Sequence, residues 1–481
     1  MTAAKPGKRK GSNASTSAPS SPNNKKNSRT SAQQTSLSSF FRPKNAEADS
    51  SVDFKPCLTP FSLIEWREFE STWIGTFKAP EPSTKFAAFD LDKTLINVQG
   101  NWKFPKDAND WCFFHPQVPQ VLQRMYNQGY KIVIISNQAG LRPAKGSTEL
   151  TKSAKEYRLK IENIAKQFDF PFTILAATGR NYMRKPSPGM WFMAEMDNGG
   201  VEVDREASFF VGDAAGRPAG WKQGALEDFS DSDLAFALNA GVPFYTPEEI
   251  FNEDICSKEK PLPLPAPSVW PIIRFHSKAL AIDHDGHKEL LQSIDQLAEL
   301  AQSQEKGLLV LLVGPPASGK STFANTHLSK LGFERANMDT LKTRKKCLDA
   351  VKLALESAKL IVVDNTNPDI ASRKSFIDIA SAAGASCVAV VFENSTRDLA
   401  THNNLYRSQL RQARYLAGPL ESKKLHLIPS IWEGVPAVAF NTYFKRFVAP
   451  SEEEGFAKIF RHVFVPGFRP PSDEALWHQY Y

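Results

Sequence analysis

Two short motifs constrain the fold of this chain more than any other feature, because each directly follows an apolar run of strand length. Asp90-Leu-Asp92-Lys-Thr94 follows the run 85–89, and Gly314-Pro-Pro-Ala-Ser-Gly319-Lys320-Ser321 follows the run 308–313. In parallel α/β sheets, functional loops lie at the carboxyl ends of strands. The motifs are too far apart to share one βα unit, and 481 residues leave room for about three domains. We therefore expect at least two α/β units.

Both halves of the chain alternate apolar, strand-like runs with helical stretches, which is typical of parallel α/β sheets. The Lys- and Pro-rich segment 258–267 between them indicates a linker. We divide the chain into a tail of 1–50, a first domain of 51–257, a linker of 258–270 and a second domain of 271–481. The strand-like runs are 85–89, 131–135, 172–176 and 208–211 in the first domain, and 308–313, 360–364 and 387–392 in the second.

The first 50 residues carry nine basic and two acidic side chains, which account for the whole net charge of +7. This segment is too polar to offset the entropy of ordering its backbone, so a disordered tail is predicted. The rest of the chain is balanced in charge, and a nucleic-acid site there must be a local patch. The cluster Lys8-Arg9-Lys10 favours nuclear import, although such runs are also common in solvated tails.

A short apolar string interrupts the tail. Gln34 is followed by Leu37 and then by Phe40 and Phe41, a spacing that places the apolar side chains on one face of a helical turn. The string resembles the PIP box, the peptide with which proteins dock on the sliding clamp of DNA replication and repair. The alternative is a chance apolar island in a linker.

Composition narrows the class of protein. No apolar run is long enough to span a bilayer, and the first residues lack the apolar stretch of a signal peptide. A soluble, intracellular protein without a membrane partner is expected. The five cysteines lie far apart and without metal-binding spacing, so we expect reduced thiols.

The first motif places two carboxylates two residues apart at the end of a strand. Asp90 and Asp92 can both approach one cation there, while Leu91 faces the core. The string D-x-D-x-T resembles the haloacid dehalogenase (HAD) phosphatases. That resemblance implies that Asp90 is the nucleophile and a Mg²⁺ ligand, and that Asp92 is the general acid and base and offers the metal its backbone carbonyl. The alternative is a solvated turn with two helix-capping Asp residues.

Three later segments extend the resemblance to HAD phosphatases. Ser136 lies at the end of another strand-like run and would hold phosphate oxygens, and Lys185, in a Pro-rich loop, would compensate negative charge. Asp213 follows the last run of the first domain and would be the third metal ligand. Many members carry a second acidic residue soon after this one; here small residues follow, so Asp228 or Asp233 would have to assist.

The second motif fits G-x-x-x-x-G-K-[ST], the P-loop. Its glycines let backbone N–H groups face the β- and γ-phosphates of a nucleotide, Lys320 would neutralise phosphate charge, and Ser321 would ligate Mg²⁺. The alternative is a Gly-rich turn that binds no nucleotide. The residues expected to hold ATP are Gly314, Pro315, Pro316, Ala317, Ser318, Gly319, Lys320, Ser321 and Thr322.

Residues downstream of the P-loop suit a kinase. Asp339 has the right chemistry to take a proton from an acceptor hydroxyl, although a helix N-cap explains it equally well. Asp364 ends a strand-like run and either holds the metal through water or forms an Asx turn. Arg407, Arg411 and Arg414 share one helical face, which is either a lid over the ATP phosphates, with Arg407 as the catalytic residue, or a solvated surface.

A HAD phosphatase followed by a P-loop kinase resembles the family of polynucleotide kinase 3′-phosphatases, in the fungal-type form without a forkhead-associated domain. The resemblance covers roughly residues 50–481 and includes the longer string Phe210-Val-Gly-Asp213-Ala-Ala-Gly. It implies an enzyme of DNA single-strand break and base excision repair. Such an enzyme removes 3′-phosphates and phosphorylates 5′-hydroxyls at DNA termini, with Mg²⁺ and ATP. We expect a monomer.

Four basic residues of the first domain are candidates for contacts with the end of a nucleic-acid strand: Arg142, Lys145, Arg180 and Arg184. RNA end repair stays open, because motifs that contact phosphates cannot read a 2′-hydroxyl. A phosphatase and kinase of small molecules, and a clamp-bound scaffold with decayed sites, are the remaining alternatives.

Overall fold

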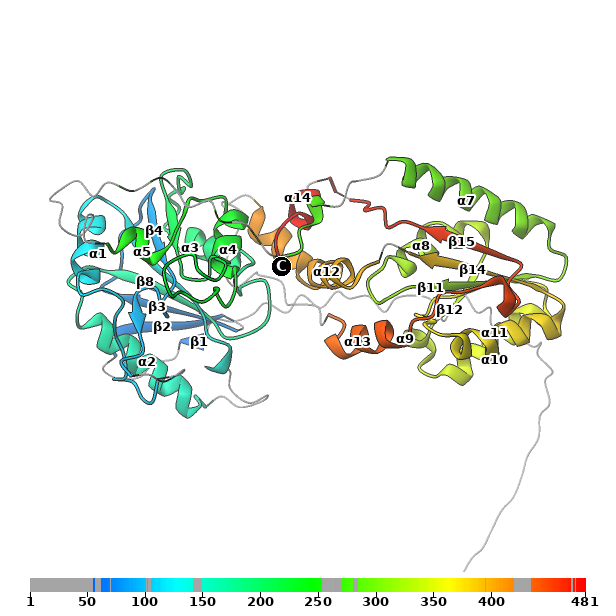
Figure 1. Cartoon of the computed structure of the whole chain (residues 1–481), viewed down its shortest axis with the longest axis horizontal. Coiled ribbons are helices and arrows are strands. Elements are labelled where there is room, and N and C mark those ends of the chain that lie inside the picture. The colour runs from blue at the N-terminus through cyan, green and yellow to red at the C-terminus, as the bar shows by residue number, and fades with distance from the viewer. Residues whose placement is uncertain are drawn as a thin grey trace, which may run out of the picture. The chain divides into compact units, whose positions relative to one another are not determined.

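The computed structural model describes residues 55–56, 62–69, 71–100, 102, 105–141, 149–252, 264, 266, 270, 272, 274–279, 284–393, 395–418, 434–468, 470–471 and 473–481. Within them, the strands form two large sheets and one two-stranded ribbon, and helices cover the large sheets (Figure 1). The clamp-like string Gln34–Phe41 and the basic cluster lie outside the described residues. Among the helices described, none combines the length and the apolar character needed to cross a bilayer.

The first sheet has eight strands in the order β1-β2-β3-β8-β7-β4-β9-β10. The strands from β8 to β10 are parallel, as the sequence predicted, whereas β3 pairs antiparallel with β8 and extends the sheet through a hairpin with β2. The bounds are β1 Lys55–Pro56, β2 Ile64–Phe69, β3 Thr72–Phe77, β4 Phe86–Phe89, β7 Lys131–Asn137, β8 Phe172–Ala177, β9 Phe209–Val211 and β10 Phe244–Tyr245, with the separate ribbon β5 Ile96–Asn97 and β6 Cys112–Phe113.

Helices cover both faces of the first sheet, because successive strand residues point to opposite sides. Ala87 and Phe89 of β4 pack in one buried cluster with α1, α2 and α5, whereas Phe86 and Ala88 pack in a second cluster with α3 and α4. The two-sided burial explains why these strands are apolar throughout. The helices are α1 Val118–Asn127, α2 Lys152–Ala165, α3 Gly189–Met196, α4 Ser232–Ala240 and α5 Pro247–Ile250.

The second sheet has five parallel strands in the order β12-β13-β11-β14-β15. Leu309 and Leu311 of the central strand β11 pack toward α10 and α11, and Val310 and Leu312 pack toward α7 and α8. The strands are β11 Leu308–Val313, β12 Glu334–Ala336, β13 Leu360–Val363, β14 Ser386–Phe392 and β15 Lys458–His462; the helices are α7 His284–Ser303, α8 Lys320–Thr326, α9 Met338–Leu341, α10 Arg344–Glu356, α11 Ile370–Ala383, α12 Arg397–Ala417, α13 Ala437–Arg446 and α14 Asp473–Trp477.

The seven strand-like runs read from the sequence are all strands, with ends that differ by at most two residues. The hairpin β2–β3 and the short or edge strands β10, β12 and β15 were missed. The sequence between β2 and β3, Glu70-Ser71, lacks the Asn-Gly or Asp-Gly signature of a tight turn. The edge strands are short or expose polar side chains, so their apolar signal is weak.

Candidate active sites

Parallel strands bring the predicted phosphatase residues to one edge of the first sheet. Asp90 directly follows β4, Ser136 is the last residue but one of β7, and Asp213 lies two residues beyond β9. These three strands are neighbours, so their carboxyl ends open together into a cavity of about 670 Å³. Lys185, which comes from the loop before α3, lines the same cavity.

Lys185 is buried at the centre of this site. Its Nζ lies 2.6 Å from Asp90 Oδ1 and 2.7 Å from Asp233 Oδ1, and it donates a hydrogen bond to the carbonyl of Ile135 at 3.0 Å. Asn137 fixes the lysine backbone, because its amide donates to the Lys185 carbonyl at 3.1 Å and accepts from the Lys185 N–H at 3.0 Å. Lys185 is therefore held in place both at its backbone and at its charged end.

Three carboxylates crowd around this one lysine. Oxygens of Asp90, Asp213 and Asp233 lie within 4.8 Å of one another. Burial raises the pKa of Asp213 to about 7, with a further contribution from the charge of Asp233. Burial also raises the pKa of Asp90, although Lys185 opposes that shift. One ammonium cannot balance three carboxylates, so the site has the excess of negative oxygen donors that a hard divalent cation requires.

Asp92 lies beside the trio of Asp90, Asp213 and Asp233, and its side chain is about half exposed. Gln138 Nε2 donates to the Asp92 carboxylate at 2.7 Å and to Ser136 Oγ at 2.9 Å. Lys160 Nζ lies 3.3 Å from the same carboxylate. Asp92 is thus oriented by two side chains and open to solvent, an environment that suits the exchange of protons with water.

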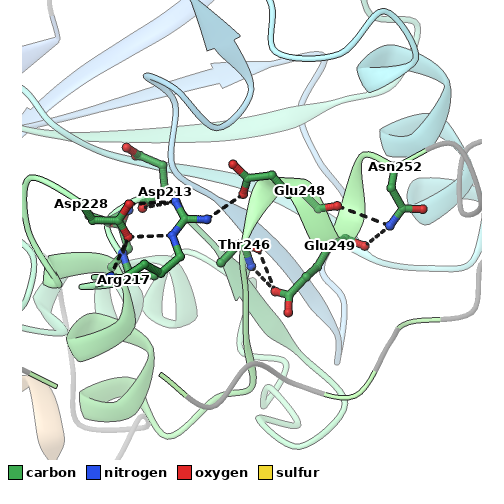
Figure 2. A network of polar contacts seen from close by, with 10 residues as sticks. Asp213, Arg217, Asp228, Thr246, Glu248, Glu249 and Asn252 are labelled. Carbon is green, nitrogen blue, oxygen red and sulfur yellow. Dashed lines mark hydrogen bonds and ion pairs between the residues drawn. The ribbon is translucent and has the colours of Figure 1, made fainter. Parts of the chain in front are cut away.

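The two candidates for the assisting carboxylate have different surroundings. Asp233 belongs to the trio, whereas Asp228 accepts hydrogen bonds from the buried guanidinium of Arg217 at 2.7 and 3.0 Å (Figure 2). Arg217 also donates to Glu248 at 2.9 Å and to the backbone carbonyl of Asp213 at 3.1 Å. Of the two alternatives that the sequence left open, the geometry therefore favours Asp233, and Asp228 belongs to a supporting network.

Two of the four cations considered for strand contacts line the phosphatase cavity. Arg180 is exposed and Arg184 half-buried, and Phe229 lines the same cavity. Burial, followed by the charge of Arg180, lowers the pKa of Arg184. Arg142 and Lys145 lie outside the described residues.

The predicted P-loop runs between β11 and α8. Gly319 adopts φ +93°, a left-handed conformation that favours glycine, and Lys320 begins the helix. Lys320 is buried, and its Nζ donates to the carbonyl of Pro315 at 2.5 Å and to Ser318 Oγ at 3.2 Å. Burial lowers the pKa of Lys320 to about 8. The loop thus curls around the lysine, while Ser321 and Thr322 are exposed.

A cavity of about 260 Å³ opens beside the P-loop. Gly319 and Thr322 line it together with Asn403, Tyr406 and Arg407 of α12. Arg407 is therefore the arginine of the predicted row that reaches this cavity. The other two arginines do not fit the lid interpretation. Arg414 forms an ion pair with Asp473, and Arg411 is exposed but does not line this cavity.

Asp339 lies in α9, and Asp364 directly follows β13. The N-cap of α9 is Asn337, whose side chain accepts from the N–H of Thr340 at 2.9 Å, so the N-cap interpretation of Asp339 is wrong. Asp339 is exposed and does not line the cavity of about 670 Å³ formed near Pro316 and Asn365. Asp364 is buried and accepts from Arg335 Nε at 2.8 Å, so its carboxylate forms an ion pair.

Sequence reasoning missed side chains that hold the predicted residues in place. At the phosphatase cavity these are Asn137 and Gln138, which lie at the end of β7 and carry no motif of their own. At the P-loop it is Asn403 of α12, far along the chain, which donates a hydrogen bond to the carbonyl of Ala317 at 3.3 Å. The one usable signal was the amide-rich string Asn137-Gln138 at a strand end.

Fold and sites together define a protein with a HAD-type phosphatase unit followed by a P-loop kinase unit. The family model "Polynucleotide kinase 3 phosphatase" matches residues 85–251, and the model "AAA domain" matches 309–409. The motif that begins at Asp90 lies within the first range, and the P-loop lies within the second.

Similarity to curated proteins extends over nearly the whole chain. Over 441 residues it is 34% identical to the bifunctional polynucleotide phosphatase/kinase of Schizosaccharomyces pombe, with 89% of this chain and 93% of that protein covered. Over 214 residues it is 28% identical to the polynucleotide 3′-phosphatase of Saccharomyces cerevisiae, covering 34% of this chain and 86% of that protein. The chain belongs to the family of bifunctional polynucleotide phosphatase/kinases.

Proposed function

We propose that this protein heals DNA strand breaks by removing 3′-phosphates and phosphorylating 5′-hydroxyls, which leaves ends that a ligase can join. The observation that carries the proposal is the contact of Lys185 with both Asp90 and Asp233, in one cavity with Asp92 and Asp213. A carboxylate nucleophile beside a fixed cation is the arrangement that phosphoryl transfer to Asp90 needs. The P-loop in the same chain supports the second activity.

In the phosphatase half, Asp90 attacks the phosphorus of the 3′-phosphate, and the bond between phosphorus and the 3′-oxygen breaks. Asp92 gives its proton to the departing 3′-oxygen. It then takes a proton from the water that attacks the aspartyl-phosphate, which releases inorganic phosphate and restores Asp90. Ser136 and Lys185 hold the phosphate oxygens, and the half-exposed position of Asp92 supports its exchange of protons with solvent.

The residues of the phosphatase cavity fit a magnesium ion. Asp90 and Asp213 offer carboxylate oxygens within 4.8 Å of each other, and Asp92 would add its backbone carbonyl. When bound there, Mg²⁺ supplies positive charge between the attacking carboxylate and the phosphate. Asp233 neutralises and orients Lys185.

In the kinase half, residues 314–322 hold the β- and γ-phosphates of ATP, and Ser321 is the candidate ligand for the accompanying Mg²⁺. The 5′-oxygen attacks the γ-phosphorus, the bond to the bridging oxygen breaks and ADP leaves, while Asp339 takes the proton of the 5′-hydroxyl. Arg407 lines the nucleotide cavity and stabilises charge on the transferring group.

The test uses nicked DNA duplexes and matched RNA duplexes that carry 3′-phosphate and 5′-hydroxyl ends, with Mg²⁺ and labelled ATP. The wild type is expected to convert both DNA ends. Asp90→Asn should abolish only dephosphorylation, and Lys320→Ala only phosphorylation, because each removes a charged group from one of the two sites.

Three results would contradict this assignment. Loss of both activities in either folded variant would refute the independence of the sites. Preference for RNA ends would indicate RNA repair. Turnover of small phosphate esters without action on any polynucleotide would indicate a metabolic enzyme.

We also propose that the protein works in the nucleus and docks on the sliding clamp through Gln34, Leu37, Phe40 and Phe41. The paired aromatic residues in a polar tail support this. Binding of the isolated peptide 31–44 to the clamp, measured by calorimetry, should disappear when Phe40 and Phe41 are both replaced by Ala. Equal binding of both peptides would overturn it.

A further inference from the structure

The phosphatase cavity has an exposed aromatic ring at its rim. Phe229 is 95% exposed, the highest value among the exposed large apolar side chains of the described residues, and among these it is the one that lines the cavity of Asp90. An isolated exposed apolar residue usually needs no explanation. This one lines the same cavity as the proposed nucleophile Asp90.

The backbone on both sides of Phe229 is held in place. Asp228 accepts hydrogen bonds from Arg217, which is itself buried and bonded to Glu248 (Figure 2). On the other side, the carbonyl of Ser230 accepts from the N–H of Gly216 at 3.1 Å, and Ser230 Oγ accepts from Arg274 Nη2 at 3.1 Å. These hydrogen bonds anchor the residues on both sides of the exposed ring.

Such a ring matches one part of a strand end. The 3′-terminal nucleotide carries a phosphate, which belongs at Asp90, and a base with a flat apolar face. Base–aromatic stacking is tolerant of sequence, because every base has such a face, and an end-healing enzyme must accept all four bases. Arg180 and Arg184, on the same cavity, are placed to meet the phosphates of the strand.

Resting on the proposed function, we infer that the Phe229 ring stacks on the base of the 3′-terminal nucleotide and so positions its phosphate at Asp90. The contact is made with the base alone, and Phe229 takes no part in bond making or breaking. It therefore determines the binding of the substrate and leaves the chemical step unchanged.

The test compares two single-stranded oligonucleotides with a 3′-phosphate, one ending in an ordinary nucleotide and the other in an abasic one. For the ordinary end, Phe229→Ala should raise KM by about tenfold or more at nearly constant kcat, which corresponds to the loss of one stacking contact. On the abasic end, wild type and variant should have the same KM. Phe229→Trp should keep the wild-type KM on ordinary ends.

Leu226→Ala is the matched control, because Leu226 is 84% exposed and does not line the cavity. It should leave both constants unchanged. An unchanged KM for Phe229→Ala, or an equal rise on ordinary and abasic ends, would overturn the stacking inference while the proposed function stands. A wild type that releases no phosphate from either oligonucleotide, yet hydrolyses a small phosphate ester, would overturn both.

Discussion

Charge balance around one buried side chain organises the phosphatase cavity. Burying an ammonium is costly unless it is paired, and Lys185 lies against two carboxylates. Burial lowers the pKa of Lys185, but Asp233 and Asp90 more than offset that effect, so the lysine keeps its proton. Burial raises the pKa of Asp213 and the charge of Asp233 adds to that rise, although Lys93 and Lys185 oppose it.

Replacing Asp233 tests this balance. Asp233→Asn should lower the 3′-phosphatase rate about 10- to 100-fold, because Lys185 loses one of the two carboxylates that orient it. The 5′-kinase rate should not change. Steady-state assays of both reactions on the same preparation measure the effect.

Glu227→Gln is a suitable control, because Glu227 is exposed and lies on the same loop as Asp228. It should behave as wild type. Full phosphatase activity in Asp233→Asn would show that Lys185 is positioned by Asp90 and its backbone alone.

Among the elements, the turn into α8 requires a backbone conformation that favours glycine. Gly319 has φ +93°, and a Cβ added there would meet no atom nearer than 3.9 Å. Space is therefore not limiting, and the demand lies in the backbone conformation. L-residues adopt such angles at a cost of about 1–2 kcal/mol.

Gly319→Ala should therefore shift the loop and lower the kinase kcat/KM by about tenfold, with the phosphatase unaffected. Gly332→Ala offers a matched comparison, because Gly332 has φ +87° and open space around it but lies outside the cavity at the P-loop. It should carry similar strain, measured as a lower thermal midpoint, and normal kinase activity. Equal kinase loss in both variants would mean that strain, and not loop geometry, is responsible.

One helix serves both halves of the structure. Asn403 and Arg407 of α12 line the cavity at the P-loop, whereas Gln409 accepts a hydrogen bond from Ser187 at 3.0 Å and Leu416 packs in a buried cluster with α3. The 21 residues of α12 thus present different faces to different partners, which a helix achieves through its period of 3.6 residues.

For the whole molecule, acid should be destabilising because neutral histidines are buried. Burial lowers the pKa of His402 to about 4, and that of His462 likewise to about 4. Between pH 6.5 and 4 the unfolded chain binds the extra protons, so stability falls as the pH falls through this range. The contribution of His402 is about 3 kcal/mol, fully present above pH 6.5.

His402→Gln should reduce this acid sensitivity, because glutamine does not titrate and its amide can donate to the Trp477 carbonyl that His402 contacts at 2.7 Å. Thermal midpoints recorded from pH 7 to pH 4.5 should fall less steeply in the variant than in wild type. Parallel curves would show that His402 does not contribute to the acid sensitivity.

Sequence patterns alone were enough to predict two α/β sheets, the seven strands around the two motifs, and the motif residues at the strand ends. These features are local: a strand buried on both faces is apolar throughout, and its functional residues follow it directly. The same locality explains why the polar edge strand β15 was missed, since half of its surface needs no apolar side chain.

Only the tertiary structure chose Asp233 over Asp228, separated Arg407 from Arg414, and placed Phe229 at the rim of the phosphatase cavity. For the aspartates and the arginines, the alternatives were chemically equivalent side chains close together in the sequence. The choice depended on which partner each one contacts: Lys185 for Asp233, Arg217 for Asp228 and Asp473 for Arg414. Such pairings follow from how the loops fold over the sheet, which no short pattern encodes.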